Sequence, residues 1–291
     1  MKKARMVITC CLLCIAAAAF AQPTISFTGM TEWDRMEINA TVSLDMASAG
    51  LRMPVGRTQG EALIASEFSK LMLPSILQLQ VDSSSIVADL VRSGELTVLD
   101  VEHLALRARA VPPSLSPDLS RLLGFYTLDI AQISGALIRH SRPSEIPRTL
   151  NPIPAPAYTG IVIIAVEALS VHGMRHPAYV QPCLFPKIWD MEMNLIFERN
   201  MFNPAAGTMA RYFPVQEIFA GGPSGLSPAI TAVVGDRPLR IFARGVFGIQ
   251  PTDPIISRED ALLIISNETN RHLLREGRVA IILDDSMLKK P

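Results

Sequence analysis

A proline-rich stretch near the middle of the chain limits how the chain can fold. Residues 141–157, SRPSEIPRTLNPIPAPA, hold five prolines in seventeen positions. Proline fixes φ and has no amide hydrogen to donate, so this stretch favours an extended, poorly hydrogen-bonded connector. We therefore predict a domain boundary here, with an N-terminal domain over 23–145, a linker over 146–156 and a C-terminal domain over 157–291.

The first 21 residues, 1–21, have the pattern of a secretory signal peptide. A basic start is followed by the apolar run MVITCCLLCIAAAAF and by the triplet AFA, which ends at Ala21 and is typical of a cleavage site. We expect cleavage after Ala21 and a periplasmic protein. A lipid anchor is the alternative, but it needs a small residue before the modified cysteine, and Leu13 before Cys14 disfavours it.

The composition of the mature chain narrows its class. The hydrophobic fraction of the full sequence, 49%, is enough for folded cores. Without the three basic residues of the signal, 24 of the 27 basic residues remain against 27 acidic ones, so nucleic acid is not an expected partner. No later segment reaches the ~18 apolar residues of a membrane span. Cys183 is the one cysteine left, so no internal disulfide is expected.

Both halves show alternating strand patterns and amphipathic helix patterns. The fold class that they predict is α+β, with two small domains, each a mostly antiparallel or mixed sheet packed with helices. In the N-terminal half we predict a helix capped by Thr58 and Glu61 and kinked or ended by Pro74 near Leu73. The other elements expected there are a strand over 36–46, helices over 83–94 and 97–110, and a strand followed by a helix over 125–140.

The C-terminal half is predicted to be richer in strands. We expect strands over 158–169 and 237–249 and a hairpin that turns near 191–194. The segment TDPIISREDA (252–261) is interpreted as a turn at Thr252-Asp253-Pro254 followed by a helix capped by Ser257. That helix is expected to run to Gly277 and to be followed by the strand RVAIILDD.

Few residues have a pattern that indicates chemistry. His172, His176 and Cys183 could ligate a metal, but their loop fixes no fourth ligand, and GGPSG lacks the G-x-S-x-G spacing of a hydrolase elbow. We therefore predict a non-enzyme with no catalytic residues, no cofactor and no metal. The candidate ligand or partner contacts are Trp189, Asp190 and Glu192, which lie near one predicted hairpin tip. The simpler interpretation is that the two acidic side chains point to water at that tip.

Several segments together resemble a known family. VSLD, DSSSIVADLV, the proline linker, YTGIVI, LFPKIWD and TDPIISREDALLIISNETNRHLLREGRVAIIL occur in this order. The order is similar to that of exported envelope proteins related to flagellar assembly protein T and to small outer-membrane surface lipoproteins. The resemblance implies a structural or assembly role in the periplasm. That family continues after Tyr-Thr-Gly with Asp, Ala, Arg and Gly, whereas this chain has IAVE at 164–167.

Two function classes follow from these observations. The first is a non-enzymatic periplasmic assembly protein that binds envelope or flagellar-motor components, with exposed strand edges as a binding mode. The second is a module that binds cell-wall glycan or a small ligand, for which Trp33 and Trp189 are the natural platform. The sequence leaves the partner and the oligomeric state open.

Overall fold

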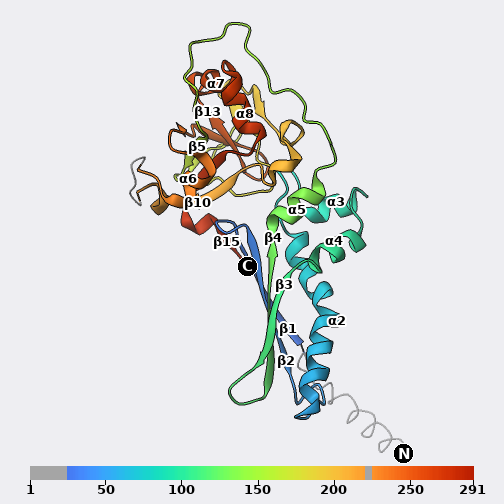
Figure 1. Cartoon of the computed structure of the whole chain (residues 1–291). Coiled ribbons are helices and arrows are strands. Elements are labelled where there is room, and N and C mark those ends of the chain that lie inside the picture. Colours follow the sequence, from blue (N-terminus) through green and yellow to red (C-terminus); the bar gives the residue numbers. More distant parts are fainter. Residues whose placement is uncertain (1–24, 220–224) are drawn as a thin grey trace, which may run out of the picture.

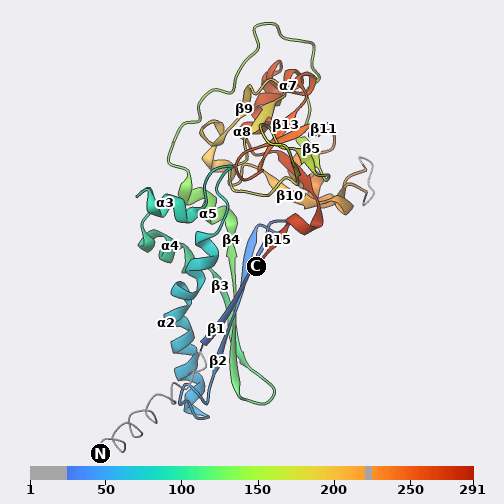
Figure 2. The same ribbon diagram turned by 180° about the vertical axis from the view of Figure 1, so that it is seen from behind.

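The computed structural model describes residues 25–219 and 225–291, so the predicted signal peptide lies outside the described residues. The protein has an α+β, two-domain arrangement, as predicted (Figure 1). An elongated N-terminal unit carries a long helix along its sheet, and a C-terminal unit of shorter strands and helices lies at one end of it (Figures 1 and 2). Within the described ranges, no helix is both long and apolar enough to cross a membrane.

The N-terminal unit is built on an antiparallel sheet with the strand order β15-β1-β2-β4-β3. Alternation in the predicted strand 36–46 is confirmed, because residues that alternate along β2 are buried on one face only. The strands are β1 (Ile25–Glu32), β2 (Glu37–Asp45), β3 (Arg109–Leu115), β4 (Arg121–Asp129) and β15 (Lys289–Lys290).

Helix α2 (Val55–Leu77) covers one face of this sheet. Its buried side chains follow helical spacing, and Phe68 stacks on Tyr126 of β4 with ring centroids 3.7 Å apart. The predicted start was wrong, because the helix begins before Thr58. Of the two outcomes expected at Pro74, the helix does not end there: proline removes one amide donor, while buried Met72 and Ile76 keep the last turns packed on the sheet.

Three short helices complete this unit: α3 (Val87–Arg92), α4 (Val98–Ala105) and α5 (Ile130–Leu137). Thr97 caps α4 by accepting a hydrogen bond from the Asp100 amide, 3.1 Å away. The helix predicted over 97–110 was too long. From Arg109 the chain pairs with β4 as the edge strand β3, in which Pro112 and Pro113 coincide with a shift of register.

The C-terminal unit contains two four-stranded sheets and a two-stranded ribbon. One sheet is parallel, in the order β10-β14-β5-β11, and its strands are β5 (Ile161–Ala165), β10 (Arg211–Pro214), β11 (Leu239–Phe242) and β14 (Val279–Leu283). The second is mixed, in the order β12-β13-β8-β9, and its strands are β8 (Ile188–Asp190), β9 (Leu195–Phe197), β12 (Gly245–Phe247) and β13 (Asp253–Ile256). The ribbon pairs β6 (Leu169–Ser170) with β7 (Pro177–Ala178).

Helices and single turns close the faces of these sheets. Helix α6 (Pro228–Val234) packs on the parallel sheet, and its Ile230 and Val234 are fully buried with Val162. The remaining elements are α7 (Arg258–Ile265), α8 (Glu268–Arg275), η1 (Arg199–Met201), η2 (Pro204–Ala206), η3 (Val215–Ile218) and η4 (Asp285–Met287).

Two predicted elements of the C-terminal half are each divided. The strand predicted over 237–249 is two strands, β11 and β12, which belong to different sheets. The helix predicted from Ser257 to Gly277 is α7 and α8, because Asn267 caps α8 by accepting from the Thr269 amide and so begins a new helix. The cap at Ser257 and the left-handed residue at Gly277 (φ 63°) are confirmed.

The proline-rich connector, residues 138–160, contains no helix or strand, but side chains of the C-terminal unit hold it in place. Asn270, which is fully buried, donates to the Pro156 carbonyl and accepts from the Tyr158 amide, both at 3.0 Å. Asn267 donates to the Ala155 carbonyl at 2.9 Å. Residues 145–157 make no backbone-to-backbone hydrogen bond, in agreement with the expectation of a poorly hydrogen-bonded connector, and the two asparagines supply donors to two of its carbonyls.

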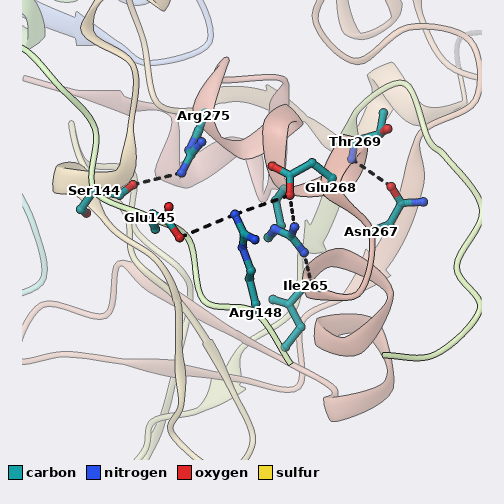
Figure 3. A network of polar contacts seen from close by, with 9 residues as sticks. Ser144, Glu145, Arg148, Ile265, Asn267, Glu268, Thr269 and Arg275 are labelled. Carbon is teal, nitrogen blue, oxygen red and sulfur yellow. Dashed lines mark hydrogen bonds and ion pairs between the residues drawn. The ribbon is translucent and has the colours of Figure 1, made fainter. Parts of the chain in front are cut away.

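A charged network fixes the start of the connector (Figure 3). Arg148 lies between Glu145, at 3.6 Å, and Glu268, at 4.0 Å, and Arg271 also pairs with Glu268. The Arg275 guanidinium donates to the Ser144 carbonyl at 3.4 Å. These contacts bring the start of the connector against α8, while Leu150 in its middle is 97% exposed.

Candidate functional site

The residues predicted as contacts lie on the β8–β9 hairpin but do not form one site. Asp190 is buried and accepts hydrogen bonds from the amides of Glu192 (2.9 Å) and Asn194 (2.8 Å), so its carboxylate shapes the turn. Glu192 is exposed and pairs with Arg258, 2.8 Å away. The Trp189 ring packs against Phe247 with centroids 5.4 Å apart. The two acids therefore serve local structure and point to different partners.

The acidic residues of the segment 252–261 do not form one site either. Asp253 lies in β13, where its Oδ1 accepts from the Lys187 amide (3.1 Å) and the Thr252 hydroxyl (2.9 Å). Burial raises the pKa of this carboxyl. Asp260 instead accepts from the Ser257 hydroxyl at 2.8 Å in the helix cap. The turn predicted at Thr252-Asp253-Pro254 was wrong, because these residues enter a buried strand.

The histidines and the cysteine that were considered as metal ligands do not form a metal-binding group among the described residues. Cys183 is buried, its amide donates to the Tyr212 hydroxyl (3.1 Å), and that hydroxyl donates to the Cys183 carbonyl (2.8 Å). Burial raises the pKa of the Cys183 thiol far above its usual range, which opposes the thiolate form that binds metals. His172 packs near Phe247 instead. Among the described residues, no group of three or more metal-binding side chains is assembled.

The two units are joined by exchanged backbone hydrogen bonds, which we call the joint. Strand β15, from the end of the chain, pairs with Thr31 and Glu32 of β1, and the Trp33 amide donates to the Leu288 carbonyl at 2.9 Å. In return, the carbonyls of Gln80, Val81 and Ser83 accept from the amides of Leu184, Phe185 and Gln250. Trp33 is therefore an interior residue of the joint, only 1% exposed, and is no sugar platform.

A cleft lies beside the joint, between the turn that follows β1 and the edge strand β10. Asp34 and Arg211 face it from the two units, and Glu217 of η3 and α6 complete its walls. Asp34 Oδ1 and Arg211 Nε are both buried, and within the described ranges neither has a hydrogen-bond partner. No sequence pattern marks these residues, because they meet only when β10 is placed next to the turn at Trp33.

The face of the N-terminal sheet opposite α2 is the other surface with functional potential. Thr28, Thr41, Phe125 and Val111 lie directly across from one another on β1, β2, β4 and β3, in a row that we call the open face. Figures 1 and 2 show α2 on one side of this sheet and no described helix on the other. Phe125 is 40% exposed and Val111 59% exposed.

Two protein families match the chain, one for each unit. Residues 24–136 match the family described as Treponema pallidum Tp0624, N-terminal domain, and residues 160–285 match the family described as Treponema pallidum Tp0624, second domain. The chain is similar to Tp0624 over both units. The stretch between the two matches contains most of the connector, so the order of domains agrees with that of Tp0624. Among curated proteins, none matches the chain.

The similarity to Tp0624 does not indicate an activity for this chain. Neither description names flagellar assembly protein T or a surface lipoprotein, so that resemblance stays a prediction. The part of the site that sequence reasoning missed is the pair Asp34 and Arg211. The approach of these two side chains to one cleft is visible only in three dimensions.

Proposed function

We propose that this chain is a non-enzymatic periplasmic assembly protein that binds other envelope or flagellar-motor components through the open face. The observation that carries the proposal is the exposure of Phe125 and Val111 on a sheet that no described helix covers on that side. An exposed aromatic and aliphatic pair, surrounded by hydroxyl side chains, is typical of the core of a protein interface.

The joint supports the same role. Strand β15, from the end of the chain, completes the edge of the N-terminal sheet. The sheet that carries the open face is therefore hydrogen-bonded directly to a strand that follows the C-terminal unit. Buried contacts of this kind resist relative motion of the units. A rigid body with one uncovered sheet face suits a component that fixes the spacing between partners.

A cross-linking capture from the cell envelope tests the proposal. The chain without residues 1–21, tagged and incubated with an envelope fraction, is expected to capture envelope or motor proteins. Phe125→Asp is expected to reduce capture by about tenfold or more, because a charge then replaces an aromatic anchor. Ala65→Asp adds the same charge at an exposed position of α2 and serves as the matched control.

Two results of this capture contradict the proposal. One is recovery of only peptidoglycan fragments, which points to the glycan-binding class. The other is equal capture by Phe125→Asp and Ala65→Asp, which removes the open face as the docking surface.

A further inference from the structure

The cleft beside the joint has the size of a ligand site. Its volume is about 420 Å³, within the usual range of roughly 300–1,000 Å³ for small-molecule sites. We call its charged side chains, Asp34, Arg211 and Glu217, the polar wall. Its apolar side chains from α6 and β10 are called the apolar wall, and Arg211 and Phe213 lie on the same strand.

The charges of the polar wall lack partners in the protein. Asp34 Oδ1 and Arg211 Nε are shielded from solvent without a hydrogen bond, and no ion pair among the described residues includes either side chain. Both residues are partly exposed and line the cleft, so a ligand can reach their charged groups there. Opposite charges that face one cleft and remain unpaired there indicate a ligand that supplies both partners.

The joint places these charges before any ligand arrives. Asp34 follows Trp33, whose ring is buried against Tyr212, and the turn is closed by a hydrogen bond from the Met36 amide to the Trp33 carbonyl at 3.3 Å. Arg211 precedes Tyr212 on β10, so the same aromatic contact fixes both backbone positions. A site whose groups are held in advance loses less entropy on binding.

The apolar wall selects for small groups. Ala229, Ala232 and Val233 of α6 line it together with Phe213 of β10. Methyl groups of the ligand would bury apolar surface there, at roughly 25 cal/mol per Å². The polar wall lies close by, so the same ligand must also carry charge.

We infer that the cleft binds a zwitterionic short peptide with small side chains. Its carboxylate pairs with Arg211, whose guanidinium suits a carboxylate, and its ammonium group pairs with Asp34, with Glu217 adding negative charge at the same wall. Its methyl side chains lie against the alanines of α6. This inference does not depend on the open face, because none of the four residues that define that face lines the cleft.

Calorimetry with L-Ala-L-Ala and two of its derivatives tests the inference. The wild-type chain is expected to bind the dipeptide and to lose about tenfold or more in affinity for the N-acetyl form and for the C-terminal amide, because each derivative lacks one charge. In Arg211→Gln the loss caused by amidation is expected to vanish, and in Asp34→Asn the loss caused by acetylation is expected to vanish. Because each variant becomes insensitive to the modification of one end only, the result assigns each end of the peptide to one side chain.

Matched controls remove exposed charges elsewhere. Arg175 and Asp236 lie at exposed positions outside the cleft. In Arg175→Gln and Asp236→Asn, both acetylation and amidation of the dipeptide are expected to weaken binding as they do in the wild-type chain. The thermal unfolding temperature of each variant shows that it is folded. The inference is overturned if the wild-type chain fails to bind the dipeptide, or if folded Arg211→Gln and Asp34→Asn retain both losses.

Discussion

The Trp33 ring meets the Tyr212 ring edge to face, with centroids 5.8 Å apart and planes at 81°. Trp33 comes from the turn after β1, and Tyr212 comes from β10 in the other unit, so this contact belongs to the joint. The Tyr212 hydroxyl continues the contact by donating to the Cys183 carbonyl at 2.8 Å. Three segments far apart in the sequence thus depend on one pair of rings.

Trp33→Ala is expected to lower the free energy of unfolding by about 3–5 kcal/mol, because the substitution leaves a cavity at a fully packed site. Urea denaturation followed by circular dichroism measures the change. Trp189→Ala is the matched control and is expected to cost less, since Trp189 is half-buried. An equal decrease in the free energy of unfolding in the two variants would contradict the claim that the joint stabilises the protein.

Asn270→Ala is expected to lower the free energy of unfolding by about 1–3 kcal/mol and to loosen the connector. The buried amide bonds the Pro156 and Leu263 carbonyls and the Tyr158 amide, and alanine leaves these backbone groups without a partner. Hydrogen exchange of the Tyr158 amide should quicken. Asn151→Ala, at an exposed position, should leave that exchange rate unchanged.

Asp253→Asn is expected to raise the stability of the protein at neutral pH. Burial raises the pKa of Asp253 above 3.8, so the folded state releases this proton at a higher pH than the unfolded state. The buried charge therefore opposes folding once the pH rises through that raised pKa. Asparagine retains the acceptor oxygen for the Lys187 amide and the Thr252 hydroxyl.

The pH dependence separates this effect from a change in packing. Well below pH 3.8, Asp253 is protonated in both states, and the advantage of Asp253→Asn should be smallest. The advantage should grow as the pH rises from there through the raised pKa of the folded state, and it should stay constant above that pKa. An advantage of the same size at every pH would show that charge is not the cause.

Arg211→Met is expected to leave the stability of the unliganded protein unchanged or to raise it. The substitution keeps an unbranched chain in the cleft and removes a buried donor that has no partner among the described residues. Thermal unfolding without added peptide is the measurement. A clear loss of stability would mean that Arg211 serves the fold and not a ligand.

Local features of the fold could be predicted from the sequence, because their causes are local. The alternation in β2, the cap at Ser257 and the left-handed Gly277 each depend on a few neighbouring residues. The division of 237–249 between two sheets could not be predicted, since each half is extended and only tertiary pairing separates them. Asp253 likewise has the sequence of a turn, yet pairing with β8 and β12 makes it part of a buried strand.

The candidate sites were less accessible to sequence reasoning. Trp189, Asp190 and Glu192 were correctly placed on one hairpin, but their partners (Phe247, the turn amides and Arg258) come from separate elements. The cleft joins Asp34 to Arg211 across the two units, and neither residue lies in a recognisable pattern. The open face could not be predicted without the register of four strands, and the sequence of a single strand does not determine that register.

Photo-cross-linking in living cells tests the central claim most directly. A photoreactive amino acid is placed at position 125 on the open face or at position 65 on the exposed side of α2, and the cells are irradiated. The account predicts a discrete cross-linked envelope or motor protein from position 125 and none from position 65. The same product from both positions, or no protein product from position 125, would contradict it.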